Sequence, residues 1–344
     1  MVNSVISYPG AKLRFYPHMR EYFPEDMKVF IEPFFGGGSV SLNVAVDSRF
    51  SKVERIIGGD LYSEVWAMWN GVKKHPNEVI EIASKWFTIG CPHQKEINQL
   101  GFYGNEARKY LEGGDLENYK QSDILTDNEK KEIEEKINLY NIVCEEAKKF
   151  WDWSQTVDTS EMTLAERAAR FLLVNKISFS AMGDSGSLSK DQFCEFRLGK
   201  LDNVHTVSKI MNERNIEVNN VSFEETMKYA SNDGAFVFLD PPYLKQEASG
   251  LYGKNGGTHK GFPHELFAEE TKKLPCKWFV TYDDSVAVRK LFSGKTVDGG
   301  EIFITPFTIP GGYTMAGKTA EDALKGEEVF ITNYDLDDDE PEEF

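Results

Sequence analysis

The residues best suited to chemistry in this chain are Asp240, Pro241, Pro242 and Tyr243, which follow a short apolar run at residues 235–239. The carboxylate of Asp240 and the carbonyl oxygen of Pro241 could accept both hydrogens of a nucleobase amino group, such as that of adenine. This would draw the nitrogen towards a tetrahedral geometry and free its lone pair for attack on an electrophile. Tyr243 offers a flat face on which an extruded base could stack. The alternative is structural, because two prolines also end a strand in a rigid turn.

A second candidate is the glycine run at residues 36–38, between a predicted strand at residues 29–31 and a predicted helix at residues 39–46. Glycines at such a junction let the backbone approach a ligand closely. No Lys-Ser or Lys-Thr pair follows the run, which argues against a P-loop. Of the two aromatic residues before it, Phe34 and Phe35, one is expected in the core. The other could lie near a bound cofactor, although both could be core residues.

Asp60 and Lys12 are the polar candidates around this glycine run. Asp60 ends a predicted strand at residues 53–57 and lies 24 residues after Gly36, close to the spacing at which an acid holds ribose hydroxyls in Rossmann-like folds. It could equally cap the helix that begins at Leu61. Lys12 follows a tight turn near the start of the chain, where it could reach the carboxylate of an amino-acid-like cofactor. A lone lysine is more often a solvated surface charge.

An α/β sheet must position these residues. The strand, glycine turn, helix and second strand up to Asp60 make one βαβ unit. The apolar runs at residues 235–239 and 277–282 are typical of buried parallel strands. Two further runs, at residues 301–305 and 328–334, could be closing strands that form a hairpin pair. The sequence therefore predicts a Rossmann-like sheet built from the two ends of the chain.

A helical segment of more than 100 residues interrupts this sheet. Thr126-x-x-Glu129 and Thr163-x-x-Glu166 are capping boxes, which predict the starts of two of its helices, and a loop of small residues at 178–189 follows the second. We therefore expect a catalytic domain of residues 1–63 and 200–334, a mainly helical insertion of residues 64–199, and a disordered acidic tail of residues 335–344.

The net charge of −17, taken alone, argues against a polyanionic partner. Much of this charge is local, since the acidic tail carries seven acids and no base, and residues 112–135 carry nine acids and three lysines. Positive charge gathers in residues 8–20 and in residues 244–261. These two stretches could still bind a polyanion, because the position of the charge matters more than the total.

The four cysteines are scattered along the chain, with no C-x-x-C pair: Cys91, Cys144, Cys194 and Cys276. They indicate reduced thiols and a cytoplasmic protein. No run of 18 apolar residues predicts a membrane span, and the first residues lack the pattern of a signal peptide. Cys91-Pro92-His93 has no partner pair at zinc spacing, so no metal site is expected.

Taken together and in this order, these signals resemble the Dam-type, D12 class of adenine-specific DNA methyltransferases. The resemblance covers residues 8–12, 30–44, 60 and 235–334, and it is far more specific than any single motif. Residues 262–266 and the closing run at 328–334 are also similar to the family's pattern. The resemblance implies a Rossmann-like fold of the S-adenosylmethionine-dependent methyltransferases, with a mainly helical inserted target-recognition domain.

The resemblance also implies roles for individual residues. The catalytic element would comprise Asp240, Pro241, Pro242 and Tyr243, and a methyl group from S-adenosylmethionine would pass to an adenine flipped out of double-stranded DNA. The cofactor would be held by Tyr8, Lys12, Phe35, Gly36, Gly37, Asp60 and Asp240. Asn175-Lys176 is similar in position to the family's Asn-Arg segment. Together with the local positive charge, this gives as candidate DNA contacts Lys176, Phe179, Met182, Lys190, Lys245, Lys254 and Lys260.

Residues 180–186 depart from the pattern of family members that recognise GATC, because they lack the basic and asparagine residues found there. The target sequence, and any partner restriction endonuclease, are left open. Phe179 or Met182 could enter the base stack or pack under the loop. Two other functions stay open: a methyltransferase of the same fold for RNA or cytosine, and a silent DNA-binding relative. Asp240, where cytosine enzymes have serine, disfavours the cytosine reading, and the intact catalytic element disfavours the silent relative.

Overall fold

The computed structural model describes the chain except for residues 103, 112–119, 123, 232, 245–260, 309–326 and 337–344. Within the described residues, seven strands form one sheet in the order β3-β2-β1-β4-β5-β7-β6. The strands are β1 (Val29–Glu32), β2 (Arg55–Gly59), β3 (Ile216–Asn219), β4 (Ala235–Leu239), β5 (Lys277–Asp283), β6 (Phe303–Thr308) and β7 (Glu327–Thr332). The predicted α/β fold is therefore confirmed.

The direction of the strands brings the candidate site residues to one edge of the sheet. Strands β3, β2, β1, β4 and β5 are parallel neighbours, whereas β7 runs antiparallel to both β5 and β6. The expected pairing of the two closing strands is thus confirmed. Because the carboxyl ends of parallel strands meet at one edge, the glycine turn after β1, Asp60 after β2 and Asp240 after β4 all leave the sheet there.

The apolar runs of the central strands are buried on both faces of the sheet. On one face, Phe23 packs against side chains of β4 and β5, with ring centroids 5.0 Å from Phe236, 5.8 Å from Phe238 and 5.4 Å from Phe279. The other face carries a second cluster of buried residues that includes Ile31, Val237, Leu239 and Val280. This two-sided burial explains why these strands lack the alternation of a half-exposed sheet.

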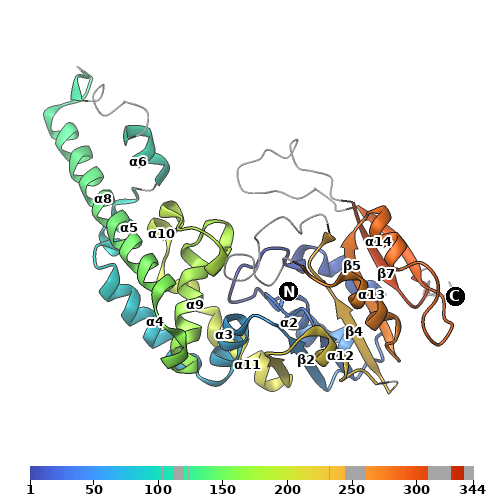
Figure 1. Cartoon of the computed structure of the whole chain (residues 1–344). Helices are drawn as coiled ribbons and strands as arrows, with labels where there is room; N and C mark the ends of the chain where they lie inside the picture. Colours follow the sequence, from blue (N-terminus) through green and yellow to red (C-terminus); the bar gives the residue numbers. More distant parts are fainter. Residues whose placement is uncertain are drawn as a thin grey trace.

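Helices cover the sheet and fill the long segment between β2 and β3. The described helices are α1 (Tyr16–Met19), α2 (Ser39–Val46), α3 (Ser63–Lys74), α4 (Pro76–Gly90), α5 (Gln94–Leu100), α6 (Gly104–Leu111), α8 (Asp127–Thr156), α9 (Leu164–Ile177), α10 (Lys190–Glu195), α11 (Asn203–Glu213), α12 (Phe223–Met227), α13 (His264–Lys272) and α14 (Val286–Leu291). The long helix α8 projects away from the sheet, with α6 beside its far end (Figure 1).

Helix α9 anchors this helical segment by packing closely on α3 and α4. Gly71 of α3 makes the close approach possible, since a Cβ at this position would lie 2.4 Å from Cβ of Ala168 and 2.8 Å from the carbonyl oxygen of Leu164. Both capping boxes are confirmed, with Thr126 capping α8 and Thr163 capping α9. The chain therefore leaves the sheet at β2, packs a helical layer beside it, and returns at β3.

Helix α2 and strand β4 have the bounds that the sequence predicts, whereas β2 begins two residues later than expected. The short strand β3 was not predicted. No helix in the described part of the chain is both long and apolar enough to cross a membrane. No group of three or more His, Cys, Asp or Glu side chains among the described residues is arranged to hold a metal ion.

Candidate active site

Asp240 sits at the carboxyl end of β4 with its carboxylate fixed by two neighbours. The hydroxyl of Thr281, from the adjacent strand β5, donates to Oδ1 at 2.7 Å. The ammonium of Lys12 lies 2.8 Å from Oδ1 and donates to Oδ2 at 2.9 Å. The Lys12 side chain is only 4% exposed, while that of Asp240 is 19% exposed. The Asp240 carboxylate is therefore oriented, has its charge compensated by the buried Lys12 ammonium, and remains accessible to a ligand from solvent.

Lys12 reaches this position because the N-terminal segment folds over the sheet edge. The N–H of Ala11 donates to the carbonyl oxygen of Tyr8 at 3.1 Å, which closes the predicted turn. The ammonium of Lys12 also donates to the carbonyl oxygen of Gly10 at 3.0 Å. Lys12 is therefore a buried residue of the site rather than a solvated surface charge.

Tyr243 is buried and its ring is covered, which differs from the open stacking face that the sequence suggested. Its ring stacks on Tyr282 with centroids 5.6 Å apart at 25°, and the Lys12 ammonium lies 4.9 Å from its centroid. The Tyr282 hydroxyl is hydrogen-bonded to Nδ1 of His264. Burial, followed by the charges of Glu328 and Asp240, raises the pKa of Tyr243 well above its usual value. In this arrangement the Tyr243 ring packs between Tyr282 and Lys12.

Two buried carboxyl groups surround the Lys12–Asp240 pair. Burial raises the pKa of Glu328 in β7 to about 7, although the charge of Lys12 opposes the rise. Burial also raises the pKa of Glu32, at the end of β1, to about 8. Glu32 accepts a hydrogen bond from the N–H of Ser41 at 3.1 Å and another from its hydroxyl, so it ties β1 to the first turn of α2.

The glycine turn lies directly under Tyr8. A Cβ on Gly36 would come within 2.8 Å of Tyr8 Cε1, and one on Gly37 within 2.7 Å of Tyr8 Cβ. The side chain of Phe35 lies in the core against Trp69, with centroids 5.3 Å apart, so Phe35 could meet a ligand only through its backbone. Phe34 is the half-buried member of the pair. The expectation that one of the two is a core residue is met by Phe35.

Asp60 joins the glycine turn to the start of α3. Its Oδ2 accepts the N–H of Gly36 at 2.9 Å, and its Oδ1 accepts the N–H of Tyr62 at 2.8 Å. Burial raises the pKa of Asp60 to about 6, although these two hydrogen bonds oppose the rise. Each carboxylate oxygen can accept more than one hydrogen bond. Asp60 thus has a structural partner on each oxygen and capacity for a ligand hydroxyl.

The small-residue loop, residues 178–189, carries the candidate DNA contacts Phe179 and Met182. Phe179 is 55% exposed and Met182 is half-buried. Ser180 and Ala181 have φ values of 52° and 55°. Residues other than glycine rarely adopt this left-handed backbone conformation, and those that do are concentrated at functional sites. The side-chain amide of Asn175 holds the loop by donating to the carbonyl oxygen of Ala181 at 2.9 Å.

The lysines proposed as DNA contacts are in different situations. Lys176 is half-buried at the end of α9, and burial, with a smaller contribution from Lys200, lowers its pKa to about 8. Lys190 is exposed at the start of α10. The other three candidates lie outside the described residues: Lys245, Lys254 and Lys260. The same holds for most of the acidic tail, from residue 337 onward.

A pocket opens where the N-terminal turn, the end of β2 and the small-residue loop meet. It is lined by Tyr8, Pro9, Tyr62, Phe171, Asn175, Ala181, Met182, Gly183, Asp184 and Ser185.

The structure gathers the predicted site residues at the carboxyl ends of the parallel strands. Tyr8, Gly36, Gly37 and Asp60 lie together, and Lys12 and Asp240 lie beside them. Sequence reasoning missed Thr281, Tyr282, Tyr62 and Asp184. The signal for Thr281 was a hydroxyl directly after the apolar residues 278–280 of β5.

Comparison with known proteins shows matches over most of the chain. The family model for D12 class N6 adenine-specific DNA methyltransferases matches residues 8–302, a span that runs from Tyr8 past Asp240 and Thr281. The chain is also similar to the Type II methyltransferase M1.LlaDCHI of Lactococcus lactis subsp. cremoris. The two are 23% identical over 337 residues, which cover 95% of this chain and 94% of that protein.

Proposed function

This chain belongs to the D12 class N6 adenine-specific DNA methyltransferase family, and on that premise we propose that it methylates the exocyclic amino nitrogen of an adenine flipped out of duplex DNA, with S-adenosylmethionine as the methyl donor. The observation that carries the proposal is the carboxylate of Asp240, held by Thr281 and Lys12 at the edge where the glycine turn and Asp60 also lie. The donor, when bound, supplies an electrophilic methyl group on a sulfonium.

Asp240 would act by accepting a hydrogen bond from the adenine amino group. Its carboxylate is already aimed by Thr281 and Lys12, so little reorganisation is needed when the base arrives. The carbonyl oxygen of Pro241 remains our candidate for the second acceptor. As the amino nitrogen bonds to the methyl carbon, the bond between that carbon and the donor sulfur would break and S-adenosylhomocysteine would be left. The nitrogen would then carry a positive charge that the carboxylate of Asp240 stabilises until the proton is released to water. In-line placement of nitrogen and methyl carbon supplies much of the remaining acceleration.

The residues around the glycine turn fit the proposed cofactor. Asp60 offers a carboxylate to ribose hydroxyls, and Leu61, which follows it in the chain and is 64% exposed, supplies apolar surface beside it. Gly36 and Gly37 are buried, and because they carry no side chains Tyr8 can pack directly against them. Lys12 is engaged by Asp240, so we assign its main role to that carboxylate rather than to the cofactor.

We propose that the helical segment, residues 64–199, is the target-recognition domain. The small-residue loop would contact DNA through Phe179 and Met182, and Lys176 and Lys190 would contact phosphates. The contribution of Lys245, Lys254 and Lys260 stays a prediction. Mass spectrometry of nucleosides after incubation with duplex DNA and S-adenosylmethionine tests the whole proposal. N6-methyladenine is the expected product, and methylated cytosine, methylated RNA alone or no product would contradict it.

Cofactor affinity should depend on pH through Asp60. The pKa of this group is raised to about 6, so its carboxylate is ionised above pH 6 and becomes protonated below it. Since the ionised form is the better acceptor for ribose hydroxyls, affinity for S-adenosylhomocysteine should fall as the pH is lowered from 7.5 to 5. Calorimetry across this range measures the effect.

Asparagine in place of Asp60 should weaken binding and abolish this pH dependence, because an amide does not titrate. Asp298→Asn serves as the control, since Asp298 is an exposed acid remote in sequence from the glycine turn. A pH profile that is the same for Asp60→Asn and the unmodified protein would remove Asp60 from the cofactor site.

Phe179→Ala should impair DNA binding with little effect on stability. The side chain is 55% exposed, so its loss costs little packing, whereas stacking of an aromatic ring on a base contributes about 1–3 kcal/mol. The expected result is a rise in KM for duplex DNA of about 10-fold or more with a nearly unchanged melting temperature. A duplex with a mismatch at the target adenine should reduce the defect, because the base is already easier to extrude. An unchanged KM would show that Phe179 does not touch DNA.

A further inference from the structure

We propose that the hydrogen bond between Tyr62 and Asp184 positions the small-residue loop relative to the cofactor side of the site, so that cofactor and DNA bind cooperatively. Tyr62 and Asp184 are thus positioning residues that act through Asp60 and through the loop. This inference rests on the proposed function, because it assigns the cofactor to Asp60 and the DNA to the small-residue loop.

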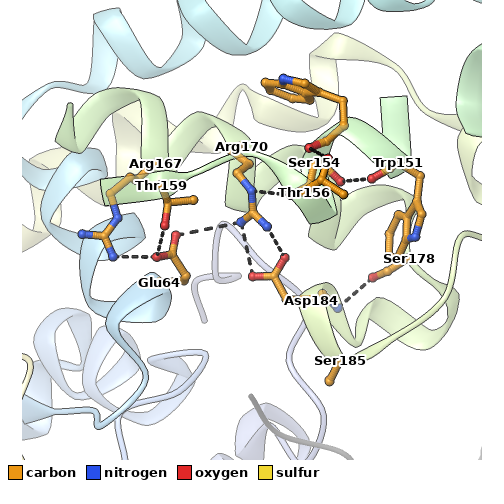
Figure 2. A network of polar contacts seen from close by, with 12 residues as sticks. Glu64, Trp151, Ser154, Thr156, Thr159, Arg167, Arg170, Ser178, Asp184 and Ser185 are labelled. Atoms are coloured by element: carbon orange, nitrogen blue, oxygen red, sulfur yellow. Dashed lines mark hydrogen bonds and ion pairs between the residues drawn. The ribbon is translucent and has the colours of Figure 1, made fainter. Parts of the chain in front are cut away.

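Asp184 accepts hydrogen bonds from both Tyr62 and Arg170. The hydroxyl of Tyr62 donates to its Oδ2 at 2.6 Å. The guanidinium of Arg170 donates to its Oδ1 at 2.7 Å and to its Oδ2 at 3.3 Å, and Figure 2 shows Arg170 reaching Asp184 from α9. The side chains of Asp184 and Arg170 are 3% and 6% exposed. A buried carboxylate with a bidentate guanidinium partner holds its geometry closely.

Arg170 in turn is fixed to the helical segment. Its Nε donates to the carbonyl oxygen of Ser154 in α8 at 2.7 Å, and its other end approaches Glu64 at 3.9 Å. Glu64 is paired with Arg167 at 2.6 Å (Figure 2). Two carboxylates and two guanidinium groups thus compensate one another in the interior, as buried charges require. Asp184 is therefore anchored to α3, α8 and α9 rather than to a mobile neighbour.

Tyr62 connects this anchor to the cofactor side. Its backbone N–H donates to Oδ1 of Asp60, while its rigid ring carries the hydroxyl to Asp184. Asp60 also accepts the N–H of Gly36. Tyr62 is thus hydrogen-bonded both to Asp60, the carboxylate proposed for the ribose, and to Asp184, the carboxylate within the loop. A ligand that fixes Asp60 would therefore also fix Tyr62 and, through its hydroxyl, the contact with Asp184.

The small-residue loop needs such support because its backbone is strained. Ser180 and Ala181 occupy the left-handed region, and such residues persist only where their surroundings hold them. A second tie comes from Asn175, which bonds Ala181 and also Ser7, beside Tyr8, at 2.7 Å. Residues of the N-terminal turn, of the segment after β2 and of the loop meet around a small pocket between the two ties.

The test is the thermodynamic coupling between the two ligands in the full-length protein. Affinity for a duplex that contains the target is measured by fluorescence anisotropy, with and without S-adenosylhomocysteine. Affinity for S-adenosylhomocysteine is measured by calorimetry, with and without the duplex. The two ratios must be equal by linkage. We expect the unmodified protein to show a coupling factor of about 10, within the usual range of about 5–150.

Tyr62→Phe removes only the hydroxyl and should bring this factor to within about 2-fold of unity, and raise KM for DNA more than it lowers kcat. Thr159→Val is the matched control, because it removes a hydroxyl that bonds Glu64 at 3.2 Å at the far end of the same network, and it should keep the factor near 10. Equal factors in Tyr62→Phe and the unmodified protein, or equal losses in both variants, would overturn the inference.

Hydrogen exchange gives an independent measurement that needs no variant. Amides of residues 178–189 should exchange more slowly when S-adenosylhomocysteine is bound, and unchanged exchange would also overturn the inference. Failure of this inference can be told apart from failure of the proposed function. A protein that forms N6-methyladenine but shows a coupling factor of unity refutes only the inference, whereas a protein that forms none refutes the proposed function itself.

Discussion

Replacement of Asp240 by alanine is expected to lower the rate of methyl transfer by at least about 100-fold, the scale for loss of one positioned polar group in an active site. The variant would lose the acceptor for the amino hydrogen and leave the positive charge of Lys12 without the Asp240 carboxylate beside it, where further positive charge develops. Asp240→Asn should also be poor, because its amide is uncharged and its NH2 group cannot face the ammonium. Single-turnover assays at saturating DNA and cofactor measure this step directly.

Asp233→Asn is a suitable control for the loss of a carboxylate. Asp233 pairs with Lys28 at 3.1 Å, but the two side chains are 88% and 50% exposed, so its substitution should leave the rate unchanged. Methylation of adenine by Asp240→Ala at close to the normal rate would disprove the role of Asp240 in catalysis.

Lys12→Met is the second change with a large expected effect. It removes the cation that orients and neutralises Asp240, and a fall in the single-turnover rate of about 100-fold is expected. The pKa of Glu328 should also change. Burial has raised it to about 7 and the charge of Lys12 opposes that rise, so loss of the ammonium should move the titration of Glu328 to higher pH.

The same variant should unfold more easily. Removing one partner of a fully buried ion pair costs about 3–5 kcal/mol, and about 1–3 kcal/mol is expected here because Asp240 keeps access to water. Lys28→Met is the matched control, since exposed pairs contribute less than about 1 kcal/mol. Denaturant unfolding of both variants makes the comparison. Equal stability losses, or a Lys12→Met rate near normal, would show that the pair has no special role.

The parts of the fold that the sequence predicts best are those with strong local signals. The glycine run followed by an apolar stretch marks α2, and the fully apolar run at residues 235–239 marks β4. Strand β3 was missed because it is only four residues long and only two of them are buried, so neither its length nor its composition separates it from a loop. It becomes a strand through pairing with β2.

The site residues that could be predicted are likewise those with a local signal in the sequence. Asp240 and Asp60 could be found because each directly follows a strand, whereas Thr281 lies within one. Its contact with Asp240 depends on the pairing of β4 with β5, which no local pattern encodes. The covering of Tyr243 by Tyr282 has the same origin. The bond between Tyr62 and Asp184 spans 122 positions of the chain and follows only from the packing of the helical segment.

The position of β3 has a consequence for how the protein folds. Strands β2 and β3 are hydrogen-bonded neighbours, yet residues 60–215, nearly half of the chain, separate them. Closing a loop of this length carries a large entropic cost that is recovered only when the intervening helices have already collapsed. The helical segment should therefore acquire its structure first, and β3 should join the edge of the sheet late in folding. A nascent chain would hold β1 and β2 without their outer neighbour until more than 200 residues had been synthesised.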